Sequence, residues 1–189
     1  MNELIYNFAV WLDDTAYSAM LHESYYMYNW VESTHVLTLM ISLGMLFLID
    51  LRMLGYAFPV VPASYLAERL IVPMLIGFSV MFVTGILLFY AVPVRSSQSL
   101  WFRIKLVLLV ACAVNAYLFH RRMSDSVSTW DGDAKAPDRI RLGAWLSLGF
   151  WSIVVICGRF IAYDWMDCIR DQPAFIEFLA GCIEGQTRF

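Results

Sequence analysis

Three ionisable side chains lie within or at the edge of long apolar stretches: His35, His120 and Arg159. Ionisable groups inside membrane segments are usually functional. An imidazole in a helical bundle is a common axial ligand of haem iron. We therefore take His35 and His120 as candidate metal ligands. Lys105 and Arg159 are candidate partners for haem propionates or lipid headgroups, and Asn115 is a polar candidate in mid-span.

The two histidines do not suit one shared haem. His35 lies near the start of the first apolar stretch and His120 at the far end of the third, and these two stretches run in the same direction through a membrane. At 1.5 Å per residue, the two side chains differ in depth by roughly 20 Å. The alternatives are a single-histidine haem at either surface, His35 paired with His22, or a quinone site lined by these residues.

Each candidate also has a purely structural interpretation. His35 would hydrogen-bond a neighbouring helix, and His120 would belong to a basic interfacial run. Arg159 would extend to lipid headgroups, or pair with Glu32. The chain lacks the Gly-rich phosphate loop, CxxC, HExxH and nucleophile-elbow motifs. We therefore predict no catalytic residue and leave open whether the protein is an enzyme.

The composition is that of a membrane protein. Of 189 residues, 60% are hydrophobic and 15% are charged, whereas soluble domains are about half apolar and a quarter charged. The net charge of -3 argues against nucleic-acid binding, which requires a basic face. Positions 1–32 contain no Lys or Arg, so the basic start of a cleavable signal peptide is missing.

Apolar runs of spanning length predict an all-α fold. We expect a four-transmembrane-helix bundle over 31–163, amphipathic interfacial helices over 1–30 and a short tail helix within 164–189. Asp14 and Thr15 are candidate N-caps. The four spans are expected at about 31–50, 70–94, 105–120 and 142–163, with Pro73 in the first turn of the second span, and Pro173 is expected to start the tail helix.

Positive charge favours one orientation. Loops 51–69 and 120–141 hold seven of the Lys and Arg residues, and the opposite side holds five, with none in the N-terminal segment. By the positive-inside rule, we expect a multi-pass protein of the bacterial inner membrane with both termini in the periplasm.

The remaining expectations concern side-chain pairs and cysteines. Asp50 and Arg52 are expected to form an ion pair at the end of the first span. Cys168 and Cys182 would form a disulfide if the tail lies outside the cytoplasm. Two further cysteines, Cys112 and Cys157, are expected to be small buried apolar residues.

Several of these residues fall into motifs. These are WLDDTAYSAMLHES from Trp11, H-x14-DLRxLG over 35–55, KL-x8-N-x4-H over 105–120, SLxxW from Ser147 and GRxIAY over 158–163. In these the chain resembles, over about residues 10–163, an uncharacterised family of small bacterial inner-membrane proteins known as a domain of unknown function. The resemblance implies four spans and supplies no activity. It points to seven family positions: His35, Asp50, Arg52, Lys105, Asn115, His120 and Arg159. The chain departs from the family at Asn29, where proline is expected, at His22, where arginine is expected, and in its cysteine-bearing tail.

These patterns favour a membrane subunit of a redox or respiratory-type assembly. It would bind b-type haem or line a quinone site, and would pass electrons between a periplasmic partner and the membrane pool. One alternative is a non-catalytic scaffold or accessory subunit of a larger membrane complex. Another is a small oligomeric transporter. The expected partners are the lipid bilayer and membrane or periplasmic proteins, or further copies of this chain.

Overall fold

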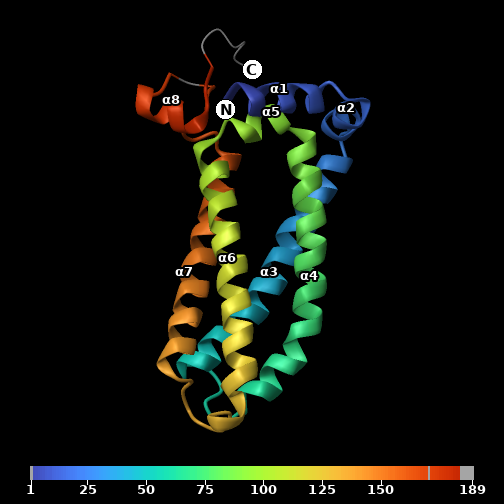
Figure 1. Cartoon of the computed structure of the whole chain (residues 1–189). Coiled ribbons are helices and arrows are strands. Elements are labelled where there is room, and N and C mark those ends of the chain that lie inside the picture. Colours follow the sequence, from blue (N-terminus) through green and yellow to red (C-terminus); the bar gives the residue numbers. More distant parts are fainter. Residues whose placement is uncertain (1, 170, 184–189) are drawn as a thin grey trace. The chain divides into compact units, whose positions relative to one another are not determined.

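The computed structural model describes residues 2–169 and 171–183, and over these residues the fold is all-α. One isolated β-bridge, Ser99–Asp167, stands outside the helices. The helices are α1 (Asn2–Asp13), α2 (Ala16–Glu23), α3 (Met27–Leu54), α4 (Ala63–Ala91), α5 (Pro93–Ser97), α6 (Leu100–Ser126), α7 (Asp138–Ala162) and α8 (Ala174–Ala180), with a 3₁₀ turn at Val127–Thr129 (Figure 1).

Four of these helices, α3, α4, α6 and α7, are long and apolar enough to cross a membrane. Each has 25 or more residues, and a bilayer needs about 20. The predicted multi-pass architecture is therefore confirmed. The two short helices before the spans and the tail helix after them are also present.

The helix boundaries differ from the prediction in two places. α4 begins at Ala63, so Pro73 lies inside the helix rather than in its first turn. Because proline removes one helical hydrogen bond and clashes with the preceding turn, it bends helices, and α4 bends in this part (Figure 1). A separate short helix, α5, begins at Pro93, at the end of the expected second span, and continues to Ser97 in the segment between the second and third spans.

The chain divides into two compact units. Unit 1 comprises the residues up to His35, Phe82–Val107 and the residues from Val154 onward. Unit 2 comprises Val36–Met81 and Leu108–Ile153. Each long helix therefore contributes one part to each unit.

In unit 1, four short helices, α1, α2, α5 and α8, gather at the ends of the long helices and form what we call the end layer (Figure 1). Thr15 caps α2 by accepting a hydrogen bond from the Ser18 amide, which confirms one predicted N-cap. The Thr15 hydroxyl also lies 2.7 Å from the Tyr90 hydroxyl of α4, and the Ser18 hydroxyl donates to the Tyr90 carbonyl. These bonds attach α2 to the end of α4.

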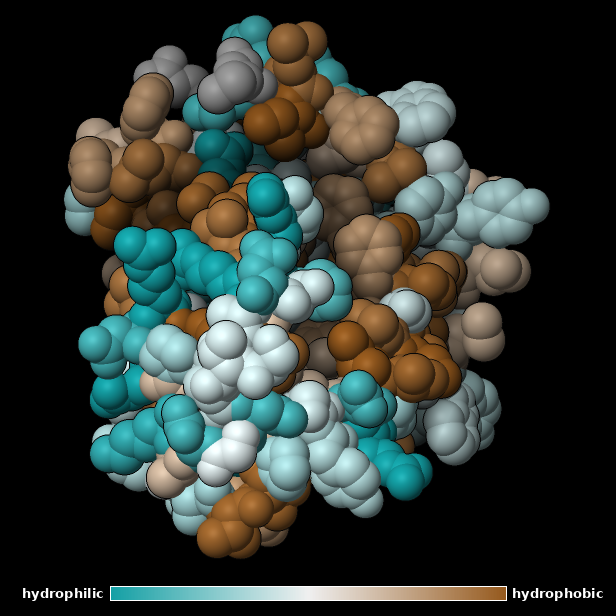
Figure 2. Space-filling model, turned by 60° about the horizontal axis from the view of Figure 1, so that its bottom comes forward, coloured by the Kyte–Doolittle hydropathy of each residue, from teal (hydrophilic) through white to brown (hydrophobic). Residues whose placement is uncertain are grey.

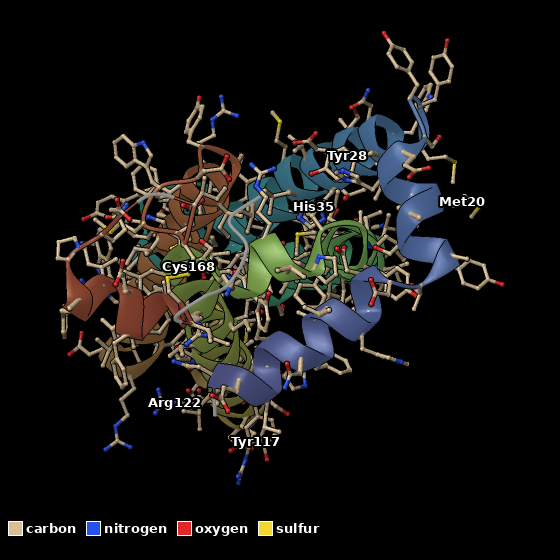
Figure 3. All side chains as sticks on the ribbon, turned by 90° about the horizontal axis from the view of Figure 1, so that it is seen from above. Met20, Tyr28, His35, Tyr117, Arg122 and Cys168 are labelled. Atoms are coloured by element: carbon tan, nitrogen blue, oxygen red, sulfur yellow. A yellow bond between two sulfur atoms is a disulfide. The ribbon has the colours of Figure 1, made fainter. Side chains whose placement is uncertain are left out.

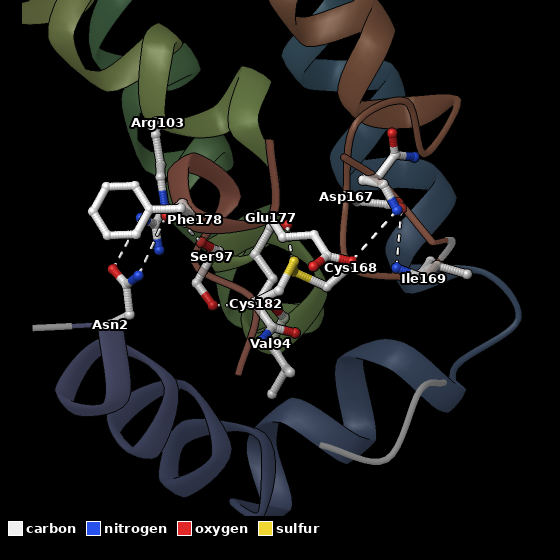
Figure 4. Close-up of a disulfide and its surroundings, with 12 residues drawn as sticks. Asn2, Val94, Ser97, Arg103, Asp167, Cys168, Ile169, Glu177, Phe178 and Cys182 are labelled. Atoms are coloured by element: carbon white, nitrogen blue, oxygen red, sulfur yellow. Dashed lines mark hydrogen bonds between the residues drawn. A yellow bond between two sulfur atoms is a disulfide. The ribbon is translucent and has the colours of Figure 1, made fainter. Parts of the chain in front are cut away.

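The rest of the end layer is held by Arg103 and by a disulfide. The Arg103 guanidinium donates to the Ser97 carbonyl of α5 and to the Asn2 side chain of α1 (Figure 4). The Asn2 amide in turn donates to the Phe178 carbonyl of α8. Cys168 and Cys182 form a disulfide, with Cα atoms 5.4 Å apart, that closes the segment containing α8.

In unit 2, an apolar core joins α3, the start of α4, the 130–136 segment and α7. It consists of Ile49, Met53, Leu54, Ala63, Trp130, Ala136, Ile140 and Ala144. α3 stops at this core because Gly55 takes a left-handed conformation (φ 78°), which glycine adopts without steric cost. Figure 2 turns the loop end of this unit forward and shows hydrophilic side chains gathered on it.

Candidate functional site

His35 lies in unit 1, between α3 and α4 (Figure 3). Its Nδ1 is 3.0 Å from the Thr84 hydroxyl of α4, and the side chain is half-buried. A Cβ on Gly85 would lie 3.2 Å from the His35 Cε1 atom. The missing side chain of Gly85 thus lets the imidazole pack edge-on against α4. The structure shows the interhelical hydrogen bond that the structural interpretation of His35 predicts.

Lys105 of α6 lies in the same unit and is half-buried. Its Nζ would be 3.8 Å from a Cβ on Gly158 of α7, and the neighbouring Cys157 is fully buried. Among the residues described, Lys105 has neither a hydrogen bond nor an ion pair. An anionic or carbonyl ligand would provide the hydrogen-bond partner that this ammonium group lacks among the described residues.

Arg159 behaves as an exposed surface residue. Its Nη2 donates to the Tyr163 hydroxyl at 2.5 Å, and its Cζ lies 4.5 Å from the centre of that ring. The predicted ion pair with Glu32 is not among the contacts the described residues make. Within the described part of unit 1, Arg95 forms an ion pair with Asp164.

The other two candidates, Asn115 and His120, belong to unit 2, whereas His35 belongs to unit 1. The Asn115 Nδ2 atom donates to the Gly143 carbonyl of α7 at 3.0 Å, so this polar residue joins two helices. His120 is exposed on α6. The five predicted site residues therefore divide between the units: unit 1 holds His35, Lys105 and Arg159, and unit 2 holds Asn115 and His120.

The predicted ion pair between Asp50 and Arg52 is wrong. Residues two apart on a helix point to nearly opposite sides, and the two side chains have separate partners. Asp50 is 3% exposed and is hydrogen-bonded to Ser147 of α7. Arg52 is fully buried and donates to the carbonyls of Val61, Asp131 and Asp133.

The loop carboxylate Asp131 was not identified from the sequence. Its two oxygens accept from the Ser64 amide at 2.7 Å and the Ser64 hydroxyl at 2.6 Å, at the start of α4. Burial raises the pKa of Asp131, but the hydrogen bonds from Ser64 and Ala63 and the nearby Arg52 cation outweigh it and hold that pKa below its usual value. This carboxylate caps a helix 67 residues away in sequence, and no local pattern signals such a cap.

The sequence contains weaker signals for other residues that contact the candidate site residues. Thr84 and Gly85 are a small polar pair inside an apolar span, which is a pattern typical of close helix packing. Ser147 belongs to the SLxxW motif. These residues were visible in the sequence, but their partners on other helices were not.

Haem ligation by His35 paired with His22 stays a prediction. The other histidine of unit 1, His22, is exposed on α2, and no group of three His, Cys, Asp or Glu residues among those described could hold a metal ion. A shallow hollow of about 150 Å³ is lined by Tyr26, Asn29, Trp30 and Ser33, whereas small-molecule pockets usually exceed about 300 Å³. Ligation by His35 alone, or by His120, stays a prediction.

Comparison of the chain with protein-family models, with curated proteins and with solved structures finds no match. The geometry of the described residues is therefore the basis for a functional proposal.

Proposed function

We propose that this protein is a membrane subunit of a redox or respiratory-type assembly in which Lys105 and His35 line a quinone site. The observation that carries the proposal is the half-buried ammonium of Lys105, which lies in a spanning helix and has no hydrogen bond or ion pair among the described residues. A lysine costs up to about 3 kcal/mol at the centre of a membrane helix and less towards its ends, and Lys105 is the sixth residue of α6. A bound carbonyl or anion would offset such a cost.

The chemistry of a quinone suits these two side chains. A quinone takes up two electrons and two protons when it is reduced, and its two carbonyl oxygens accept hydrogen bonds. The Lys105 ammonium would donate to one carbonyl oxygen. The His35 imidazole, oriented by Thr84, would hydrogen-bond the second carbonyl oxygen and exchange protons at the site.

Binding of a soluble short-chain quinone to the detergent-purified protein tests the proposal. We expect saturable binding that Lys105→Met weakens at least tenfold, because methionine keeps the length and apolar stem but removes the donor. Arg121→Met is the matched control, since Arg121 is an exposed cation on the same helix that stacks on Tyr117. Equal affinity in wild type and Lys105→Met, or no binding at all, would overturn the proposal.

The same sample should be examined by a reduced-minus-oxidised absorbance spectrum with a pyridine haemochrome count. A b-type signal that His35→Ala removes would assign haem rather than quinone to this unit. A b-type signal that survives in His35→Ala would instead exclude His35 as the ligand.

The second candidate is an accessory subunit that contacts other proteins through the end layer. Large apolar side chains of this layer are exposed, including Trp11 at 63%, Tyr17 at 69% and Phe175 at 73%. Part of this surface lies at headgroup depth if the short helices are interfacial. Stoichiometric partner chains that co-purify with wild type and are lost in Phe175→Ser would favour this function, whereas a chain that purifies alone in mild detergent would argue against it.

A further inference from the structure

The buried carboxylate of Asp50, in unit 2, is not explained by either proposed function. Asp50 is 3% exposed, and its Oδ2 atom has no hydrogen-bond partner among the described residues. The carboxylate has one hydrogen bond, with Ser147. Its neighbours along α3, Ile49 and Met53, belong to the apolar core of the unit.

Among the described residues, no cation forms an ion pair with this carboxylate. The Nε and Nη2 atoms of Arg52 are bound to backbone carbonyls, and the described residues form two ion pairs, neither of which includes Asp50. Arg141 of α7 binds Asp138. The other charged or titratable side chains of unit 2 on the neighbouring helices belong to α4, α6 and α7: Tyr65, Glu68, Arg69, Cys112, Tyr117, His120, Arg121, Arg122, Asp125 and Arg139. None of them forms an ion pair among the described residues.

A second polar side chain reaches the same face of α7. Ser147 and Gly143 are one helical turn apart, so they share a face. Asp50 of α3 is bonded to Ser147, and Asn115 of α6 is bonded to Gly143. The Asn115 Oδ1 atom would lie 3.8 Å from a Cβ on Gly143. Carboxylate, hydroxyl and amide oxygens are the ligands that hard cations prefer.

We propose that Asp50 is a cation-exchange site within the membrane domain, at which the carboxylate carries a proton or a sodium ion in the folded protein. An ionised carboxylate that is buried, has no cation beside it and has one oxygen without a hydrogen bond destabilises the folded protein. A bound monovalent cation removes that destabilisation. Ser147 would supply a neighbouring hydroxyl oxygen, and Asn115, bound one helical turn away on α7, is the candidate for a further oxygen. The site shares no residue with the proposed quinone site, since Asp50, Ser147 and Asn115 belong to unit 2.

Thermal unfolding of the full-length protein in detergent separates the two cations. If the site holds a proton, wild type in sodium-free buffer loses stability as the pH rises from 5 to 9, because the folded state keeps a proton that the unfolded chain releases. If it holds sodium, NaCl raises the unfolding temperature saturably at pH 8, and choline chloride does not. Binding of ²²Na⁺ by scintillation proximity gives a direct second readout.

Asp50→Asn keeps the shape and hydrogen bonding of the side chain but needs no cation. We expect this variant to fold, to lose the pH or sodium response of wild type and to bind no ²²Na⁺. Asp125→Asn, at an exposed acid on α6, should respond as wild type does, because it keeps Asp50. Both variants keep all three histidines, so a difference between them does not come from histidine titration. The proposal is overturned if wild type responds to neither cation. It is also overturned if Asp50→Asn keeps the wild-type response, or if it is less stable than wild type under all conditions.

Discussion

At the scale of single residues, Arg52 holds two loops of unit 2 together. Its guanidinium is fully buried and donates to the carbonyls of Val61, Asp131 and Asp133, the closest at 2.6 Å. Hydrogen bonds to a charged group contribute more than neutral ones, and an unsatisfied buried carbonyl is costly. Arg52→Met should therefore lower the free energy of unfolding by about 3 kcal/mol, and Arg52→Lys by less.

Thermal or denaturant unfolding in detergent measures this loss. Arg122→Met is the matched control, because Arg122 is exposed and makes one hydrogen bond to the Arg139 carbonyl. We expect this control to change stability by less than about 0.5 kcal/mol. If Arg52→Met and Arg122→Met had the same small effect on stability, the conclusion that Arg52 holds the two loops together would be wrong.

The lowered pKa of Asp131 makes a prediction about pH. Hydrogen bonds from Ser64 and the charge of Arg52 favour the ionised carboxylate in the folded state, so its folded pKa lies below its unfolded pKa. The group therefore adds stability above its unfolded pKa, and this contribution is lost as the pH falls through the folded pKa. Unfolding measured between pH 7 and pH 3 should show a steeper acid loss in wild type than in Asp131→Asn. Identical pH profiles for the two proteins would contradict the assignment.

At the scale of elements, α3 and α4 approach closely where Ser42 meets Gly77, within unit 2. A Cβ on Gly77 would overlap the Ser42 hydroxyl oxygen, but it would lie 3.5 Å from the Ser42 Cβ, an ordinary contact. Gly77→Ala should therefore destabilise by about 1–3 kcal/mol through overpacking, and adding Ser42→Ala should restore most of the loss. A double-mutant cycle in thermal unfolding measures this coupling.

Ser42→Ala by itself should be close to neutral, because the Ser42 hydroxyl is fully buried and has no hydrogen-bond partner among the residues described. Gly149→Ala is the control for the helix propensity of alanine, since nothing lies within 4 Å of a Cβ at Gly149. A Gly77→Ala variant as stable as Gly149→Ala would exclude close approach at this contact.

The elements that the sequence predicts are those with local signals. Long apolar runs predict the four spans, Thr15 predicts the start of α2, and Pro173 predicts the start of α8. α5 was missed because Pro93–Ser97 has just five residues and no apolar face. The contacts at the candidate site were harder to predict, since Asp131 and Ser147 meet their partners only after distant helices pack.

At the scale of the whole molecule, the orientation with both termini in the periplasm stays a prediction. The disulfide is a second argument for it. Disulfides form in oxidising compartments, and the Cys168–Cys182 bond lies in the end layer of unit 1. The positive-inside rule independently predicts a periplasmic N-terminus and C-terminus, because residues 1–32 lack Lys and Arg. Both arguments therefore predict that the end layer, and with it the end of α3 nearest His35, faces the periplasm.

Labelling of intact cells with a membrane-impermeant maleimide tests this orientation. Tyr25 is 80% exposed just before α3, and Val60 is 91% exposed in the loop after it. We expect Tyr25→Cys to be labelled and Val60→Cys to be labelled only after the cells are broken. The native cysteines should give little background, because Cys112 and Cys157 are buried and the other two are paired. The opposite labelling pattern would place the end layer in the cytoplasm, where a stable disulfide is not expected, and would remove a periplasmic electron partner from the proposed function.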